Sequence, residues 1–333
     1  MTFALMRGYD HINVVARLDP VAAVRDRELG ERIRRYPKIF PFGSPDFGHA
    51  VQRGREWRIG ALGCDDPSAA RYGLAVDLRT AAAGEPDPAT AGAMRAAAAR
   101  LDPEEGEQLE KDEWEIGDRR YRIVRVERFI HFGDRVLEPP RATDAGLAGD
   151  GLAGDGLAGD GLARDGLLRG HLIDPAAPCG QWEAQLRLNL AGFMPKPGSV
   201  PGIVRTEARH AIRTHPGVVL LPPAFVAVEL DGDSWAPLTG GDDPDEVRDR
   251  LARRFTGLLP RLREFQGDPP SAAELAEWEA MAAGIRAASG HSFSVRGREF
   301  RTVRVSRMLR LGRDGPEAPR PSDEQLDDHP ADA

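Results

Sequence analysis

The chain has 333 residues, a length that suggests about two domains. Lysine and arginine total 45 against 53 aspartates and glutamates, so the net charge is −8. Nucleic-acid-binding domains are usually basic, so this balance argues against a nucleic-acid partner. No segment approaches the ~18 apolar residues of a membrane-spanning helix. Two cysteines, Cys64 and Cys179, do not make a disulfide framework. We therefore expect a cytoplasmic protein with no membrane partner.

The predicted elements occur twice in the same order. An alternating apolar pattern predicts a first strand in each half of the chain, and a helix follows each strand. A short extended run comes next. The predicted ranges are Ile12–Arg17 and Trp182–Leu190 for the strands, Pro20–Tyr36 and Val200–His215 for the helices, and Ile39–Phe42 and Val218–Leu221 for the extended runs.

A hairpin and two helices follow in each half. Gly54 and Gly232 predict the hairpin turns, and a tryptophan sits three residues after each glycine. Asp-Asp-Pro then predicts a helix start, with the second Asp as cap and Pro in the first turn. The predicted helices are Pro244–Phe265 in the second half and, after each of these regions, Pro88–Leu101 and Ala272–Ala288. The pattern of Pro67–Thr80 leaves helix and strand open.

Two strands close each half, separated by turns at Gly117 and Gly297 and rich in β-branched residues. They are predicted at Trp114–Gly117 with Tyr121–Phe132, and at Phe293–Val295 with Phe300–Leu311. The order is an α+β pattern. Because most strands are linked by hairpins, the sheet is expected to be mostly antiparallel.

An internal duplication explains this double order. Trp114–Asp144 matches Phe293–Asp323 without a gap at an offset of 179 residues, with 11 of 31 positions identical. Trp57 and Trp235 match at an offset of 178, and the two Asp-Asp-Pro triplets at 177. Arginine-rich composition explains some arginine matches but not the paired Trp and Asp-Asp-Pro. We predict two similar units packed pseudo-symmetrically.

The duplication sets the domain boundaries. The first unit spans residues 10–144 and the second spans residues 181–314. Residues 145–180 include Gly-Leu-Ala-Gly-Asp three times. That five-residue period does not fit the nine-residue calcium-binding repeat, so a flexible low-complexity linker is expected. Residues 315–333 are rich in Pro and Asp and are expected to form a disordered tail.

The repeated arginines are the candidate ligand-binding residues. Arg125 and Arg304 lie on matching strands, and Arg141 and Arg320 lie on the matching segments after them. Because a guanidinium binds a carboxylate or phosphate through two parallel hydrogen bonds, these four residues could hold an anion. The competing interpretation is a structural pairing with acidic side chains, which the arginine-rich composition favours.

No catalytic or metal-binding motif is present. The eight histidines are not matched between the units, and no Cys or acidic pattern completes a metal set. Cys64 lies beside Asp65 and Asp66, which oppose a lowered thiol pKa. The sequence therefore predicts no catalytic residue, no metal and no cofactor.

The segments Arg35–Gln52, Tyr121–Asp144 and Gly315–Asp323 resemble an uncharacterised actinobacterial family, a domain of unknown function. The resemblance implies an intracellular actinobacterial protein and carries no activity with it.

We expect a non-enzymatic binding or protein-interaction module, with an unknown protein or a small anionic ligand as its partner. The alternative is an enzyme or small-anion-binding protein with a site between the two repeats. The sequence carries no signal for an oligomeric state.

Overall fold

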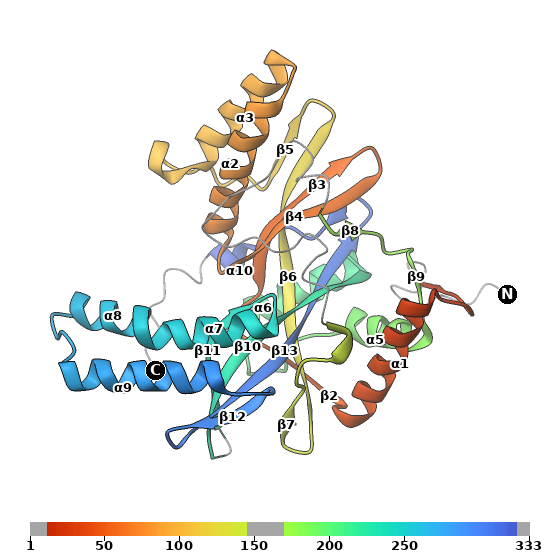
Figure 1. The fold of residues 1–333 in the computed structure, drawn as a ribbon. Coiled ribbons are helices and arrows are strands. Elements are labelled where there is room, and N and C mark those ends of the chain that lie inside the picture. Colours follow the sequence, from red (N-terminus) through yellow and green to blue (C-terminus); the bar gives the residue numbers. More distant parts are fainter. Residues whose placement is uncertain (1–11, 145–169, 233, 325–333) are drawn as a thin grey trace.

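One large antiparallel sheet forms the centre of the molecule. The computed structural model describes residues 12–144, 170–232 and 234–324 (Figure 1). The sheet has the strand order β11-β10-β13-β6-β3-β4-β8, and all recorded pairings in it are antiparallel. The strands in that order are Ser234–Gly241, Gly217–Asp231, Arg298–Gly312, Arg119–Gly133, Asp46–Arg53, Glu56–Cys64 and Leu172–Ile173.

Shorter strands pair with the two long central ones. Strands β2 (Lys38–Pro41), β5 (Glu113–Ile116) and β7 (Val136–Leu137) pair with β6. Strands β12 (Ser292–Val295) and β14 (Gly315–Pro316) pair with β13. The predicted α+β class with a mostly antiparallel sheet is therefore confirmed.

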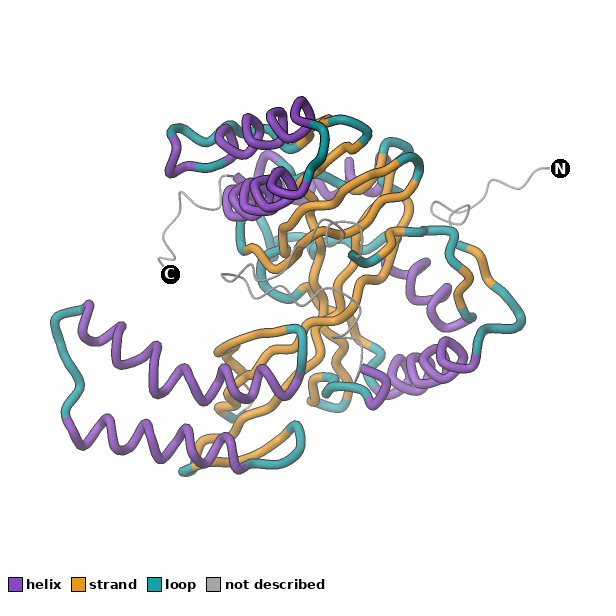
Figure 2. The backbone as a smooth tube through the Cα atoms, turned by 45° about the horizontal axis from the view of Figure 1, so that its top comes forward, coloured by secondary structure: helices purple, strands orange, loops and turns teal. Residues whose placement is uncertain are grey.

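Helices pack around this sheet in three groups. Figures 1 and 2 show two helical hairpins and a separate helical group on the opposite side. The helices are α1 (Pro20–Arg35), α2 (Pro67–Gly84), α3 (Pro88–Leu101), α5 (Gln181–Ala191), α6 (Gly202–Thr214), α7 (Pro244–Arg253), α8 (Leu259–Phe265), α9 (Ala272–Ala287) and α10 (Pro321–Glu324), with a π-helical turn at Arg254–Leu258 and 3-10 turns at Pro103–Glu105 and Ala142–Asp144. Within the described ranges, no helix is long and apolar enough to cross a membrane.

The two longest central strands, β6 and β13, pair around a local two-fold relation. Arg128 lies opposite Arg307, 179 residues away. On either side of this pair, Glu127 lies opposite Met308 and Phe129 lies opposite Ser306. At the 179-residue offset, Glu127 matches Ser306 and Phe129 matches Met308. Replacing each residue of the Glu127–Met308 pairing by its match therefore gives the Phe129–Ser306 pairing. We call residues 20–144 the first unit and residues 202–324 the second, and a residue's counterpart is its match in the other unit.

Local signals in each unit form the predicted elements. Gly54 and Gly232 have φ of 61° and 59° at the two hairpin turns, a conformation that glycine adopts without strain. The Asp66 side chain accepts a hydrogen bond from the Ala69 N–H, and Asp243 caps α7 in the same way. The segment Pro67–Thr80, for which the sequence left helix and strand as alternatives, is helical. It forms most of α2, which continues to Gly84.

The strand prediction for Trp182–Leu190 is wrong, because this segment is helix α5. The Asp26 carboxylate accepts hydrogen bonds from the backbone N–H groups of Trp182 and Glu183 at 3.1 and 2.9 Å, and so caps the helix from α1. Leu186 and Leu190 then share one buried helical face. The strand predicted at Ile12–Arg17 is reduced to β1 (Asn13–Val14), which pairs with β9 (Pro178–Cys179) outside the main sheet.

Parts of the predicted linker and tail are ordered. Residues 145–169 lie outside the described residues, but Leu172–Ile173 forms β8 on the edge of β4. In the tail, Gly315–Pro316 forms β14 and Pro321–Glu324 forms α10, with Asp323 buried. The composition of the tail predicted disorder, because composition does not reveal which distant side chains pair with the charged residues of the tail. Residues 325–333 lie outside the described residues.

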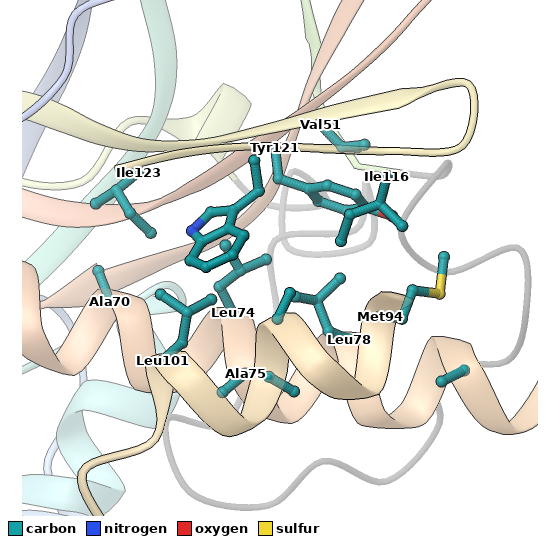
Figure 3. Packing of buried hydrophobic residues seen from close by; sticks show 14 of the residues in the cluster. Val51, Ala70, Leu74, Ala75, Leu78, Met94, Leu101, Ile116, Tyr121 and Ile123 are labelled. Carbon is teal, nitrogen blue, oxygen red and sulfur yellow. The ribbon is translucent and has the colours of Figure 1, made fainter. Parts of the chain in front are cut away.

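Each helical hairpin covers its own core. In the first unit, α2 and α3 pack their apolar faces on the sheet, with Leu74, Leu78, Met94 and Tyr121 fully buried (Figure 3). In the second unit, α7 and α9 cover a matching cluster that includes Phe255. The two cores lie at separate ends of the sheet, so the β6–β13 pairing joins the units.

We predict that Leu74→Ala lowers the free energy of unfolding by about 2–5 kcal/mol, because it removes buried apolar contacts and leaves a cavity. Urea denaturation followed by circular dichroism measures the change. The control is Val24→Ala, which removes an exposed apolar side chain from α1 and should change stability by no more than about 0.5 kcal/mol. Equal effects of the two substitutions would contradict the assigned core.

Candidate functional site

Two of the sequence-predicted arginines hold the opposite unit's tail. Arg125 of β6 contacts Asp323 of the second unit, with 2.9 Å between Nε and Oδ2. Its counterpart Arg304 of β13 contacts Asp144 of the first unit, with 3.0 Å between the same atoms. Backbone bonds repeat the exchange, since the Arg125 N–H donates to Glu317 O and the Arg304 N–H donates to Glu138 O. Each unit therefore places its C-terminal segment on the central strand of the other.

Arg141 and Arg320, the other two predicted arginines, form hydrogen bonds within these C-terminal segments. Arg141 donates to Glu138 at 2.7 Å, and Arg320 donates to Glu317 at 2.7 Å. Their backbone N–H groups donate to the same aspartates, Asp144 and Asp323. The structure thus brings the four arginines together in two clusters and gives each a carboxylate of the chain. A role in binding an external anion stays a prediction.

The two clusters differ at one buried carboxylate. Glu127 lies among Arg125, Arg320 and Arg310, at 3.1, 3.0 and 3.8 Å between nitrogen and oxygen. Burial by itself raises the pKa of Glu127, but these three guanidinium groups outweigh burial and lower it. Its counterpart is Ser306, whose hydroxyl accepts from Arg304. The Glu127 cluster therefore carries one more charge pair than its counterpart.

His131 is the counterpart of Arg310 and is fully buried. Its Nδ1 lies 3.3 Å from the backbone oxygen of Tyr36. Burial, reinforced by the charges of Arg141 and Arg304, lowers the pKa of His131 to about 4. The imidazole is therefore neutral at physiological pH.

Removal of either tail carboxylate should destabilise the fold. We predict that Asp323→Ala and Asp144→Ala each cost about 3–5 kcal/mol of unfolding free energy, because each removes the carboxylate that a buried guanidinium contacts through Nε and that also accepts from a backbone N–H of the tail. The control is Asp118→Ala, which breaks an exposed ion pair with Arg53 and should cost about 1 kcal/mol or less. Chemical denaturation of the three variants makes the comparison. Tail variants as stable as the control would show that the clusters do not hold the units together.

His131 should make stability depend on pH. Its folded pKa of about 4 lies below the unfolded value of about 6.5, so the unfolded chain binds the proton first as pH falls. The stability contributed by the neutral imidazole is fully present above pH 6.5 and is lost between pH 6.5 and 4. Wild type should lose about 3 kcal/mol more than His131→Gln over this window. Urea unfolding midpoints measured between pH 6.5 and 4 test the prediction, with the exposed His210→Gln as control. Equal losses of unfolding free energy in wild type and His131→Gln would contradict it.

A pocket lies between residues of the two units. Its lining comes from β7 and the β10–β11 turn, among others, and these elements lie at the lower end of the sheet in Figure 1. Its volume is about 470 Å³. One wall comes from the end of β6 and β7, and the other from β10, β11 and β13. The lining residues are Phe132, Arg135, Leu137, Leu230, Gly232, Ser234, Trp235, Glu299 and Arg301.

The counterpart of this pocket, at the other end of the sheet, is filled by the chain. Arg122 donates to Glu113 Oε2 at 3.0 Å, to Asp314 Oδ2 at 3.1 Å and to Pro316 O at 2.9 Å. Trp57 is only 6% exposed. It lies under Arg122, beneath the turn that carries Asp314, and beside Ile173 of β8. An acidic turn therefore occupies this end of the sheet.

Arg301, the counterpart of Arg122, lacks those carboxylates. Position 113 is matched by Ser292, whose hydroxyl accepts from Arg301 Nε at 3.0 Å. Position 314 is matched by Arg135, a second cation. Within the described ranges, no carboxylate is ion-paired with Arg301. Trp235, the counterpart of Trp57, stacks on Phe42 and stays 37% exposed.

The two turns differ for a backbone reason. Gly315 has φ of 126° and lies against the Trp57 ring, where an added Cβ would be 2.8 Å from a ring carbon. Its counterpart is Val136, a β-branched residue for which such a φ is strongly disfavoured. The first unit instead turns at Asp134 and Arg135, with φ of 47° and 62°. The pocket thus remains beside Trp235.

Two further titratable side chains, His49 and Cys64, lie outside these clusters. His49 lies 3.0 Å from Asp77 in the first core. Burial, together with the nearby carboxylates of Asp66 and Asp46, raises the pKa of Cys64 to about 11, so its thiol is protonated. No cluster of three or more His, Cys, Asp or Glu among the described residues is arranged to hold a metal ion.

Sequence comparison of the units matched Arg122 with Arg301 but did not single them out. The signal was in their partners: Glu113 aligns with Ser292, and Asp314 aligns with Arg135. At the 179-residue offset, Arg122 has two carboxylate partners, whereas Arg301 has a serine hydroxyl and no ion-paired carboxylate among the described residues.

The fold and these sites define an α+β protein built around one antiparallel sheet, with a pocket lined by Trp235, Arg301 and Glu299 among others. The chain belongs to the family of unknown function DUF5954, whose model matches residues 19–326. No curated protein and no solved structure matches the chain significantly.

Proposed function

We propose that the protein is a non-enzymatic binding module whose pocket at the unit junction takes a carboxylate-bearing segment of a partner protein. The observation that carries this proposal is the loss of both carboxylate partners at Arg301, whose counterpart Arg122 keeps them. A half-buried guanidinium with only a serine hydroxyl leaves donors free for an incoming acid.

The chain itself supplies the template for the ligand. At the filled junction, Arg122 receives the Asp314 carboxylate and the Pro316 carbonyl oxygen, while Gly315 lies on Trp57. An Asp-Gly-Pro turn from a partner would offer the same three groups to Arg301 and Trp235. The exposed indole adds apolar contact of the kind that anchors protein interfaces.

The four arginines predicted from the sequence take a structural role in this proposal. Arg125, Arg304, Arg141 and Arg320 each donate to carboxylates of the chain, so an external anion would have to displace a buried partner. Such displacement leaves a buried carboxylate unpaired and is unfavourable. Among the described residues Arg301 has no ion-paired carboxylate to displace, and Glu299 is the carboxylate that lines the pocket beside it.

We further propose that the two units arose by internal duplication. The reciprocal contacts support it: Arg125–Asp323 and Arg304–Asp144 differ by 179 residues at both ends. Glu28 accepts from Thr143, and Glu207 accepts from Ser322, at the same offset. An actinobacterial origin and a cytoplasmic location also belong to the proposal, supported by the arginine-rich composition and by two free cysteines.

A short peptide tests the proposed site. An acetylated and amidated pentapeptide with the sequence of residues 313–317, Arg-Asp-Gly-Pro-Glu, should change the fluorescence of Trp235 in a saturable way. Arg301→Ala should weaken binding about 10–100-fold, because it removes a charged hydrogen bond worth about 1.5–3 kcal/mol. The peptide with Asn in place of Asp should bind equally poorly.

Three controls decide the outcome. Arg209→Ala removes an exposed arginine of α6 and should bind like wild type, and Trp235→Phe should lose the fluorescence signal. Unchanged binding by Arg301→Ala, or no binding by wild type, would overturn the proposed site. Succinate binding as tightly as the peptide would favour the alternative, a small-anion-binding protein with its site between the units.

A further inference from the structure

The helical hairpin of the second unit carries an exposed apolar stripe. Leu258, Leu262 and Phe265 are 53%, 45% and 91% exposed. They recur at spacings of four and three residues, which places them on one side of the helix formed by the end of the π-helical turn and α8. Both views show this hairpin projecting away from the sheet (Figures 1 and 2). The stripe therefore lies on a protruding arm, accessible to another molecule.

A change of helical phase explains why these side chains face outward. Helix α7 buries Val247 and Leu251 on the core, and Phe255 continues that face. The π-helical turn at Arg254–Leu258 then adds a residue to one turn and rotates the helix that follows. After it, Leu259 packs partly on the core, whereas Leu258 and Leu262 do not.

The first unit has no such stripe. Its helices α2 and α3 bury their large apolar side chains in the core. Among the described residues of this hairpin, Tyr72 is the one large apolar side chain that is exposed. The second hairpin is also longer: its first arm spans residues 244–265, whereas α2 spans residues 67–84. The stripe is thus a specific feature of the second unit.

The outer parts of the two arms differ in charge, and some of these charges already pair within the chain: Arg253 with Asp249, and Arg263 with Asp268 and Glu274. Residues 253–265 contain four arginines and one glutamate, Glu264. Residues 272–283 contain three glutamates and no basic residue. Two such hairpins related by a two-fold axis can place each basic arm against the acidic arm of the other, because a two-fold interface uses the same patch on both copies. An arrangement that places the two basic arms against each other, and the two acidic arms against each other, would be repulsive.

From the apolar stripe and this self-complementary charge, we infer that the hairpin α7–α8/α9 is a homodimerisation surface whose partner is a second copy of the chain. The stripes of the two copies bury each other at the centre. At the rim, Arg261 of one copy faces Glu277 of the other, as in a typical interface with an apolar core and a polar edge. This inference is independent of the pocket at Arg301.

Sedimentation velocity of the full chain between about 1 and 200 µM tests the inference. Wild type should shift from monomer to dimer as concentration rises. Phe265→Asp and Leu262→Asp should remain monomeric throughout, with unchanged circular dichroism because both residues are exposed. The matched control is Ile203→Asp, an exposed apolar residue of α6, which should dimerise like wild type.

A charge exchange tests the orientation of the two copies. Arg261→Glu alone and Glu277→Arg alone should each dimerise more weakly than wild type. An equal mixture of the two should recover dimerisation, because each arm then meets an arm of opposite charge. Recovery supports the two-fold arrangement, and its absence overturns it.

Two results would overturn the inference as a whole. One is a wild-type chain that stays monomeric at every concentration. This result would hold even if the monomer bound vesicles of anionic lipid through the stripe. The other is dimerisation of Phe265→Asp with the same concentration dependence as wild type.

Discussion

The reciprocal pairs Arg125–Asp323 and Arg304–Asp144 are the constraint on which the rest of the structure depends. Each pair fixes the tail of one unit to the central strand of the other, on both sides of the β6–β13 pairing. The arginines of the tails then bind Glu138 and Glu317, so no tail charge is left alone in the interior. The two pairs match at the 179-residue offset, and the pocket lies at an end of the sheet where the matched residues differ.

Local signals made much of the fold predictable. Glycines at the hairpin turns, Asp-Asp-Pro at the helix starts and β-branched runs at the final strands act over a few residues, and the structure forms those elements. Helix α5 was not predictable in this way. Leu186, Leu188 and Leu190 fit an alternating strand, and the group that decides for helix is Asp26, more than 150 residues away. The tail was missed for the same reason, since Asp323 is ordered by Arg125.

The candidate site shows a related limit of residue matching. Positions shared by both units, such as Arg125 and Arg304, proved to be joined to carboxylates of the chain. The pocket depends instead on differences: Ser292 in place of glutamate, and Val136 in place of glycine. Each difference is small in the sequence and becomes meaningful only when the fold shows which side chains share a junction. Duplication, as we propose it, would conserve the framework and leave one copy free to acquire a new ligand.

The exchanged tails also affect the order in which the chain can fold during synthesis. The first unit is complete in sequence at Asp144, yet Arg125 finds its partner only when residue 323 has been made. Until then, the Arg125 guanidinium has Glu127 of its own strand but lacks the Asp323 carboxylate that it contacts through Nε. The full set of reciprocal contacts between the two units can therefore form only after the last residues of the second unit have been made.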